Sequence, residues 1–134
     1  MAHILVVEHD NDLRNLLADL LALEGYTVAT AEDGQAALEL LRHARPDLIL
    51  LDLLLPRMDG WTFARQCDAD PIGHGLPIIV LSTASSASTV LRELAGTGVR
   101  RVLEKPFDFE ALLALVAALL TPARPLGRGR DPDA

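Results

Sequence analysis

Ionisable and hydroxyl side chains stand at the ends of four short apolar runs in this sequence. They are Glu8, His9 and Asp10, then Asp52, then Ser82 and Thr83, and finally Glu104 and Lys105. Carboxylates outside a dedicated cage of protein ligands usually hold Mg²⁺ together with a phosphate group. An ammonium suits one phosphoryl oxygen, and a hydroxyl can donate to another. If the fold gathers these residues, they support phosphoryl transfer onto a carboxylate, with an aspartate as the nucleophile.

Lys105 is the single lysine of the chain, and the other eleven of its 12 basic residues are arginines. A planar guanidinium does not fit where a compact ammonium must reach into a small site. The one lysine is therefore a candidate for direct contact with a phosphoryl group.

The elements that must position these residues alternate between two patterns. Apolar runs predict strands at residues 4–7, 26–31, 47–52, 77–82 and 99–104. Helical spacing predicts helices over 13–21, 33–44, 87–95 and 109–120, and a further helix that starts near Gly60. The first is expected to be capped by Asp10 or Asn11 and to stop at Gly25. Asp33 and Asp108 are expected to cap the helices over 33–44 and 109–120. Five strand-then-helix units predict an α/β fold, a parallel sheet with helices on both faces. Ligands of such sheets bind at the carboxyl ends of the strands, where the candidate residues stand.

The composition limits the classes of function. A chain of 134 residues, 50% of them hydrophobic, suffices for one domain with a buried core. The net charge of -7 argues against nucleic-acid binding, and no apolar run approaches the ~20 residues needed to cross a membrane. The single Cys67 is typical of a reducing compartment, and no signal peptide is recognisable, so we expect a cytoplasmic protein. Residues 121–134, rich in Pro, Arg and Gly, are expected to form a disordered tail.

Four stretches together resemble the receiver domain of two-component response regulators, over about residues 3–120. They are ILVVEHD, PDLILLDLLLPRMDG, LPIIVLST and EKPF, and their spacing is specific as a set. The resemblance is to a single-domain, CheY-like receiver spanning residues 1–120. It implies a doubly wound, flavodoxin-like fold, with five parallel strands in the order 2-1-3-4-5 flanked by five helices.

The resemblance also implies roles for individual residues. Asp52 would be the phosphoacceptor, Ser82 the hydroxyl that reports phosphorylation, and Lys105 the partner of the phosphoryl oxygens. Mg²⁺ would be held by Glu8, Asp52 and the backbone carbonyl of Leu54. The phosphoryl donor would be a sensor histidine kinase or a histidine phosphotransfer protein. Such a domain is not an enzyme in the ordinary sense, because at most it catalyses its own phosphorylation and dephosphorylation.

His9 departs from the family pattern, because it occupies the second acidic position, where an Asp normally binds Mg²⁺ directly. Neutral imidazole is a poor ligand for Mg²⁺ and prefers softer metals, and imidazolium would repel the cation. Three interpretations stay open for His9: a metal ligand that weakens Mg²⁺ binding or favours Mn²⁺, a pH-sensitive element, or a drifted position in a degenerate receiver. Asp10 is expected to cap the following helix. It is disfavoured as a replacement metal ligand for His9, since adjacent strand residues point to opposite faces.

Two further departures concern signalling. Val102 stands three residues before Lys105, where the family often has an aromatic residue that moves on activation, so an aromatic switch is not expected. Counting forward from Pro77 places Ser82 at the hydroxyl position, whereas counting back from Lys105 places Thr83 there. One extra residue therefore lies between them. We expect it in the loop 84–88 and favour Ser82, because loops absorb insertions more readily than buried strands.

Two functions are compatible with these residues. The first is a working response regulator that accepts a phosphoryl group on Asp52 and signals by contact with another protein, and Lys105 and Ser82 favour it. The second is a receiver-like module that binds a partner independently of phosphorylation, and His9 and Val102 favour it. No output domain is expected after residue 120, and homodimerisation through the last helix is compatible with the resemblance. Nucleotide or flavin binding is disfavoured, because no Gly-rich loop follows the first strand.

Overall fold

The computed structural model describes residues 2–83 and 86–121, which form five strands and five helices in strict alternation. In chain order they are β1 (His3–Val7), α1 (Asn11–Leu23), β2 (Thr27–Ala31), α2 (Gly34–His43), β3 (Leu48–Asp52), α3 (Gly60–Ala69), β4 (Ile78–Ser82), α4 (Ala87–Glu93), β5 (Val99–Glu104) and α5 (Phe109–Leu120). The predicted α/β alternation is confirmed.

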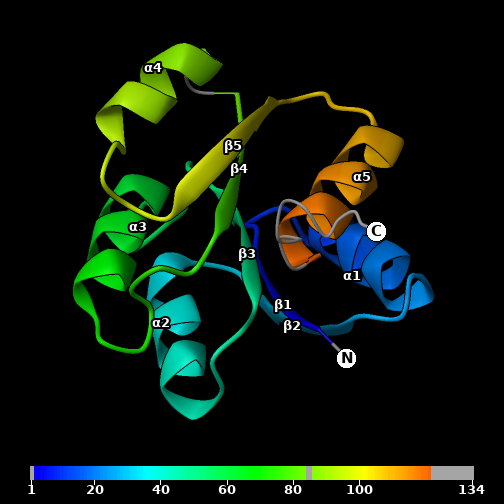
Figure 1. Cartoon of the computed structure of the whole chain (residues 1–134), viewed down its shortest axis with the longest axis horizontal. Coiled ribbons are helices and arrows are strands. Elements are labelled where there is room, and N and C mark those ends of the chain that lie inside the picture. Colours follow the sequence, from blue (N-terminus) through cyan, green and yellow to red (C-terminus); the bar gives the residue numbers. More distant parts are fainter. Residues whose placement is uncertain (1, 84–85, 122–134) are drawn as a thin grey trace, which may run out of the picture.

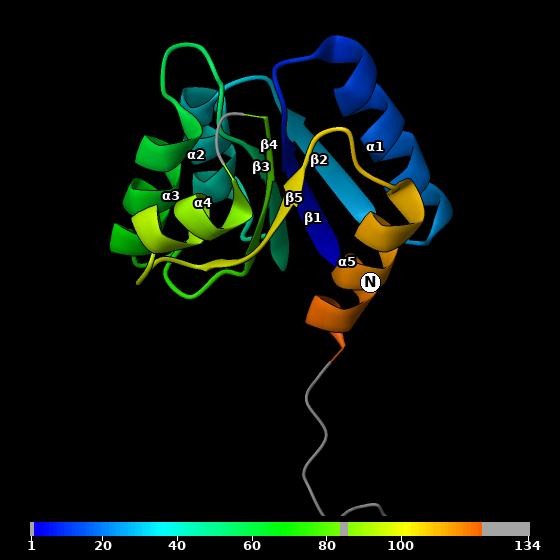
Figure 2. The same cartoon turned by 90° about the horizontal axis from the view of Figure 1, so that it is seen from above.

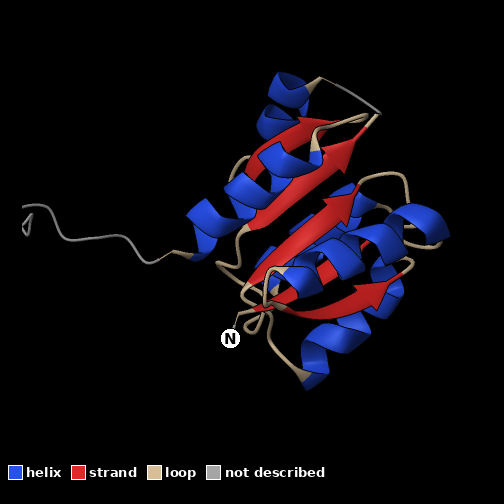
Figure 3. Ribbon diagram, turned by 90° about the vertical axis from the view of Figure 1, so that its right-hand side faces the viewer, coloured by secondary structure: helices blue, strands red, loops and turns tan. Residues whose placement is uncertain are grey.

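The strands form one sheet in the order β2-β1-β3-β4-β5, and every neighbouring pair is parallel. All the strand arrows in Figure 3 point toward the same edge of the sheet. The expected doubly wound order is therefore confirmed. The chain runs outward from β1 to β2 and then returns past β1 to β3. The strand order reverses between β1 and β3, and ligands of open α/β sheets bind at such a point.

Alternate side chains of the strands pack on opposite faces of the sheet. Helices α1 and α5 cover one face, and α2, α3 and α4 cover the other (Figures 1 and 2). The strand residues buried toward α1 and α5 are Ile4, Val6, Leu48, Leu50, Ile79 and Leu81. Those buried toward the other three helices include Leu5, Val7, Ile49, Leu51 and Val80. Strands β3 and β4 are buried at every position, which explains their continuous apolar sequences.

Short polar side chains begin the helices, because each accepts a hydrogen bond from a backbone N–H of the first turn. The capping residues are Asp10, Asp33, Asp59, Ser86 and Asp108. Helix α1 ends before Gly25, whose φ of 96° lies in the left-handed region that glycine adopts freely. Helix α4 ends at Glu93, two residues earlier than predicted, and Leu94 already has non-helical dihedral angles.

The edge strand β5 contains a bulge at Arg100, where the pairing with β4 shifts by one residue. Pairing is regular after the bulge and ends with Ser82 opposite Glu104. The bulge accommodates one extra residue inside the sheet. The sequence analysis places the extra residue in the loop 84–88 instead, of which residues 84 and 85 lie outside the described part.

Residues 122–134, which make up nearly all of the expected disordered tail, also lie outside the described part of the chain. Within residues 2–83 and 86–121, no helix combines the length and the hydrophobicity needed to span a membrane.

Candidate functional site

The carboxyl ends of β1 and β3 and the residue after β5 bring three charged side chains into contact. The Lys105 ammonium lies 2.8 Å from Glu8 Oε1 and 3.6 Å from Asp52 Oδ2. Glu8 is 1% exposed and Asp52 is 6% exposed. Their charges therefore interact in surroundings where water screens them little. The three residues come from segments 44 to 97 positions apart in sequence only because parallel strands end at one edge.

Asp52 is the less compensated of the two buried carboxylates, since the ammonium lies closer to Glu8. Burial and the negative charge of Glu8 raise the pKa of Asp52 to about 6, against the opposing effect of Lys105. The backbone N–H of Leu54 donates to Asp52 Oδ1 at 3.2 Å and also favours the ionised form. A buried carboxyl group with a perturbed pKa beside the chain's one lysine marks this edge as the candidate site.

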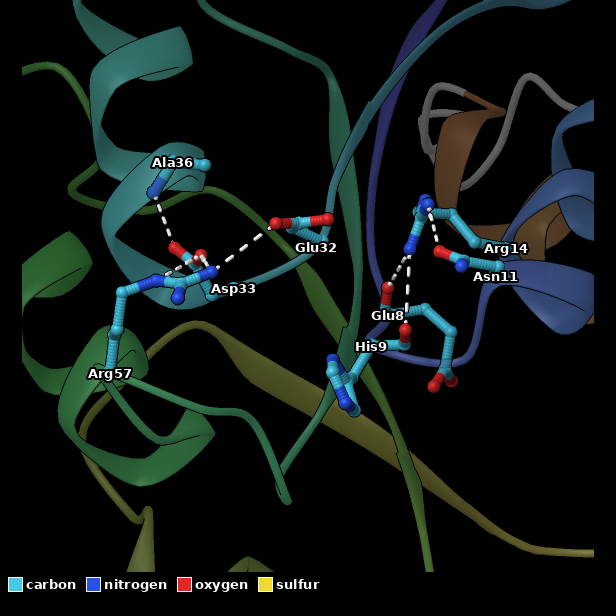
Figure 4. A network of polar contacts seen from close by, with 8 residues as sticks. All are labelled: Glu8, His9, Asn11, Arg14, Glu32, Asp33, Ala36 and Arg57. Carbon is cyan, nitrogen blue, oxygen red and sulfur yellow. Dashed lines mark hydrogen bonds and ion pairs between the residues drawn. The ribbon is translucent and has the colours of Figure 1, made fainter.

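The turn after β1 is held through its backbone. The Asp10 N–H donates to Glu8 Oε2 at 3.1 Å. The Arg14 guanidinium reaches back from α1 and donates to the carbonyl oxygens of Glu8 and His9, at 2.9 and 3.4 Å (Figure 4). A second nitrogen of Arg14 donates to Asn11 Oδ1. Arg14 therefore fixes the path of the chain on both sides of His9 without contacting the imidazole.

His9 is exposed, and its imidazole does not join Glu8 and Asp52 in a metal-binding group. No three His, Cys, Asp or Glu side chains within residues 2–83 and 86–121 are grouped closely enough to hold a metal ion. Asp10 serves as the expected helix cap: it accepts from the Leu13 N–H at 3.0 Å, which lowers the pKa of Asp10. The remaining donors, two buried carboxylates and the nearby backbone, fit Mg²⁺, which binds one or two carboxylates and keeps several waters.

Two close backbone approaches shape the loop between β3 and α3. A Cβ on Gly60 would lie 2.5 Å from the Asp52 carbonyl oxygen, and the Gly60 N–H donates to the Leu53 carbonyl at 2.9 Å. A Cβ on Gly34 would lie 2.7 Å from the Met58 carbonyl oxygen. Only glycine fits at these two positions, so the start of α2 and the start of α3 both pack directly on this loop.

Arg57 links the loop between β3 and α3 to the segment between β2 and α2 through ion pairs. Its Nε donates to Asp33 Oδ2 at 2.8 Å, while its Nη2 donates to the same oxygen and, at 3.2 Å, to Glu32 Oε1 (Figure 4). The Asp33 side chain is buried, and its other oxygen accepts from the Ala36 N–H in the cap of α2. The Ala36 N–H and Arg57 together lower the pKa of Asp33. Sequence reasoning identified Asp33 as a cap but missed Arg57, whose partner lies 24 positions away.

The two candidate hydroxyl residues lie in different surroundings. Ser82 is buried at the end of β4, and its carbonyl accepts from the Lys105 N–H at 2.8 Å. Thr83 is exposed and lines an apolar hollow of about 330 Å³. The other residues around this hollow are Leu13, Lys105, Pro106, Phe107 and Phe109. Val102 is half-buried against the core on the side of α2, α3 and α4.

The doubly wound sheet and the acidic edge with its lysine define a class of protein. The family model of the response regulator receiver domain matches residues 4–117 of the chain. The chain therefore belongs to the receiver domain family of two-component response regulators, which is a family of signalling modules.

Individual relatives agree with this assignment. The chain is 41% identical over 122 residues to response regulator MprA of Mycolicibacterium vanbaalenii, covering 91% of this chain and 52% of the relative. The chain thus spans about half the length of the curated relatives it matches. The chemotaxis response regulator CheY4 of Vibrio cholerae superimposes with a TM-score of 0.82 at 32% identity, over 90% of this chain and 99% of that one. The receiver domain of the Pseudomonas aeruginosa sensor histidine kinase PA1611, solved with a magnesium ion in its active-site cleft, gives a TM-score of 0.78 at 29% identity, over 89% of this chain and 97% of that one.

Proposed function

We propose that the chain is a phosphoacceptor in a two-component phosphorelay, with Asp52 as the residue that receives the phosphoryl group. The observation that carries the proposal is the pair of buried carboxylates beside Lys105 at the switch point of the sheet. A pKa of about 6 leaves Asp52 ionised at neutral pH, as a nucleophile must be. The Lys105 ammonium lies 3.6 Å from Asp52 Oδ2, so it can form an ion pair with a phosphoryl oxygen once the phosphoryl group is attached.

In the proposed step, an Asp52 carboxylate oxygen attacks the phosphorus of a phosphohistidine on the partner. An oxygen–phosphorus bond forms, the phosphorus–nitrogen bond breaks, and the partner's imidazole leaves with the electron pair and takes up a proton. The Leu54 N–H orients the attacking carboxylate through its bond to Oδ1. The burial of Ser82 beside the Lys105 backbone supports Ser82, in preference to Thr83, as the hydroxyl that reports the new phosphate.

Glu8, Asp52 and the backbone carbonyl of Leu54 are the groups proposed to hold Mg²⁺, which when bound neutralises charge on the phosphoryl oxygens. The magnesium ion in the related PA1611 receiver supports this assignment. His9 supplies no negative charge and lies outside any metal-binding group of the described residues. We therefore expect weaker Mg²⁺ binding than three carboxylates would give, and Mn²⁺ as a competing choice.

The proposed phosphoryl donor is a sensor histidine kinase or a histidine phosphotransfer protein, and the proposed output is contact with a downstream protein. The apolar hollow beside Lys105 and Thr83 supports docking at this edge, because a partner that covers it approaches the side of the sheet where Asp52 lies. A homodimer through α5 and a cytoplasmic location belong to the same proposal.

A second candidate function is a receiver-like module that binds its partner without phosphorylation. The exposed His9 in place of an acidic ligand favours it. In that case the ion pair between Lys105 and Glu8 is permanent, and the side chains of the site do not change conformation during signalling.

Phosphoryl loading separates the two functions. The protein is incubated with acetyl phosphate and either Mg²⁺ or Mn²⁺, and its intact mass is measured. We expect an adduct of one phosphoryl group that Asp52→Asn abolishes and that the control Asp10→Asn retains, since asparagine also caps a helix.

If an adduct forms with Mn²⁺ but not with Mg²⁺, His9 has changed the metal preference of the site. An adduct in His9→Asp but not in the wild type supports the second function. No adduct in either protein contradicts the role of Asp52 as the phosphoacceptor.

A further inference from the structure

The loop between β3 and α3 alternates between buried and exposed residues, and several of its hydrogen bonds are local. The Leu55 N–H donates to the Leu53 carbonyl at 3.2 Å, and the Met58 N–H donates to the Pro56 carbonyl at 2.7 Å. Leu54 is 54% exposed. These bonds between residues two positions apart define turns, and the buried Leu53 and Leu55 attach the loop to the core. The exposed side of the loop is held by a further contact with another element.

Arg57 supplies such a contact from the tip of the loop. Its two bonds to Asp33 and its bond to Glu32 reach the segment between β2 and α2. Asp33 is a rigid anchor, because its side chain is 5% exposed and it also caps α2. A guanidinium that makes two bonds to one carboxylate restricts orientation as well as distance.

The backbone of Arg57 adopts a conformation that is uncommon for a residue with a side chain. Its φ of 65° lies in the left-handed region, where a residue with a Cβ is disfavoured and glycine is not. A conformation of this kind persists when surrounding contacts hold it in place. Here the contacts are those of the guanidinium with Asp33 and Glu32.

We propose that Arg57 is a positioning residue for the chemistry of Asp52. Its bonds to Asp33 and Glu32 hold the loop so that the Leu54 backbone faces Asp52. The inference rests on the proposed function of Asp52 and assigns a role that the contacts at Asp52 alone do not reveal. Arg57 does not touch Asp52. It acts through Leu54, three residues earlier, whose N–H orients the carboxylate at 3.2 Å and whose carbonyl is a proposed metal ligand.

Four variants separate positioning from general stability. Arg57→Gly removes the guanidinium and keeps a residue that adopts the positive φ. Asp33→Asn removes the charge facing Arg57 but retains a side chain that caps α2. Arg57→Lys keeps a cation without the two-pronged geometry. Arg65→Ala removes an exposed arginine of α3 as a matched control.

The first readout is hydrogen exchange of the Leu54 amide in the unphosphorylated protein, which does not depend on phosphorylation. We expect Arg57→Gly and Asp33→Asn to speed this exchange about tenfold, while amides of the buried strand β3 stay as in the wild type. The double variant should be no faster than Arg57→Gly alone, because Arg57→Gly already removes the bonds to both Asp33 and Glu32. Arg57→Lys should recover part of the protection, and Arg65→Ala should change nothing.

The second readout is labelling of Asp52 by acetyl phosphate. In Arg57→Gly and Asp33→Asn we expect the maximal labelling rate to fall about tenfold, with the acetyl phosphate concentration at half-maximal rate little changed. Unchanged Leu54 exchange in Arg57→Gly overturns the inference, and so does equally faster exchange throughout β3, which marks a loss of overall stability. If wild-type Asp52 takes no phosphoryl group, the proposed function fails, and the exchange experiment still decides whether Arg57 positions Leu54.

Discussion

The ends of β1 and β3 carry the two buried carboxylates of the site, and the two differ in how closely a positive charge approaches them. Glu8 has the Lys105 ammonium at 2.8 Å, and its backbone is held by Arg14. Asp52 has the same ammonium only at 3.6 Å, and burial and Glu8 raise its pKa to about 6. One lysine thus compensates one carboxylate well and the other poorly. The less compensated carboxylate, Asp52, is the one that we propose as the nucleophile.

The largest effect is expected from removing the shared cation. Lys105→Met keeps much of the side-chain volume but leaves Glu8 buried without its ion partner. We expect the free energy of unfolding at neutral pH to fall by about 3 kcal/mol, as measured by urea denaturation. The loss should shrink in acid, where the carboxyl groups become protonated. A variant as stable as the wild type at neutral pH would show that Lys105 does not compensate the pair.

The negative charge on Asp52 should destabilise the folded protein. The pKa of Asp52 is raised from 3.8 to about 6, so the folded protein binds a proton more tightly than the unfolded chain does. Wild-type stability should therefore fall as the pH rises from about 4 to about 6. Asp52→Asn lacks this fall and should be more stable by on the order of 2 kcal/mol at neutral pH.

Thermal unfolding at several pH values measures this difference. The gap between Asp52→Asn and the wild type should close near pH 4. A gap of the same size at pH 4 and pH 7 contradicts the assignment of the shifted pKa to Asp52.

A smaller effect is expected from loosening the end of β1. Arg14→Leu keeps an aliphatic side chain but removes the donor to the Glu8 and His9 carbonyls. We expect a loss of about 1 kcal/mol, with faster amide exchange confined to residues 9–11. Faster exchange at Leu54 as well would show that the two ends of the site are not held independently.

The smallest effect on stability is expected at His9. Because the imidazole is exposed, His9→Ala should change the free energy of unfolding by less than about 0.5 kcal/mol.

His9→Asp should instead raise Mg²⁺ affinity about tenfold, since a third carboxylate joins the site. Calorimetric titration with Mg²⁺ measures this, and an unchanged affinity would contradict the proposal that His9 weakens Mg²⁺ binding.

Much of the fold could be predicted because its determinants are local. Apolar runs placed all five strands to within a residue, and Asp33 and Asp108 marked helix starts by hydrogen bonds that span two or three residues. The meeting of Glu8, Asp52 and Lys105 could also be anticipated, because every parallel strand ends at the same edge.

The contacts that escaped prediction depend on geometry that a spacing pattern does not contain. The bond between Arg57 and Asp33 requires a left-handed residue at the tip of one loop and a buried cap on another. The preference of Lys105 for Glu8 is a matter of less than an ångström between two similar acceptors. The sequence indicated one extra residue before Lys105 but did not assign it to a bulge at Arg100, in an edge strand that alternates weakly between apolar and polar residues.

That bulge also bears on how chains of this kind diverge in length. Sheet pairing joins Ser82 to Glu104, and a backbone bond joins Ser82 to Lys105, so their mutual position does not depend on the number of residues between them. We therefore expect that removal of the extra residue at the bulge leaves the pairing of Ser82 with Glu104 unchanged. Counting back from Lys105 in sequence leads to Thr83, whereas the strand pairing supports Ser82 as the proposed hydroxyl residue.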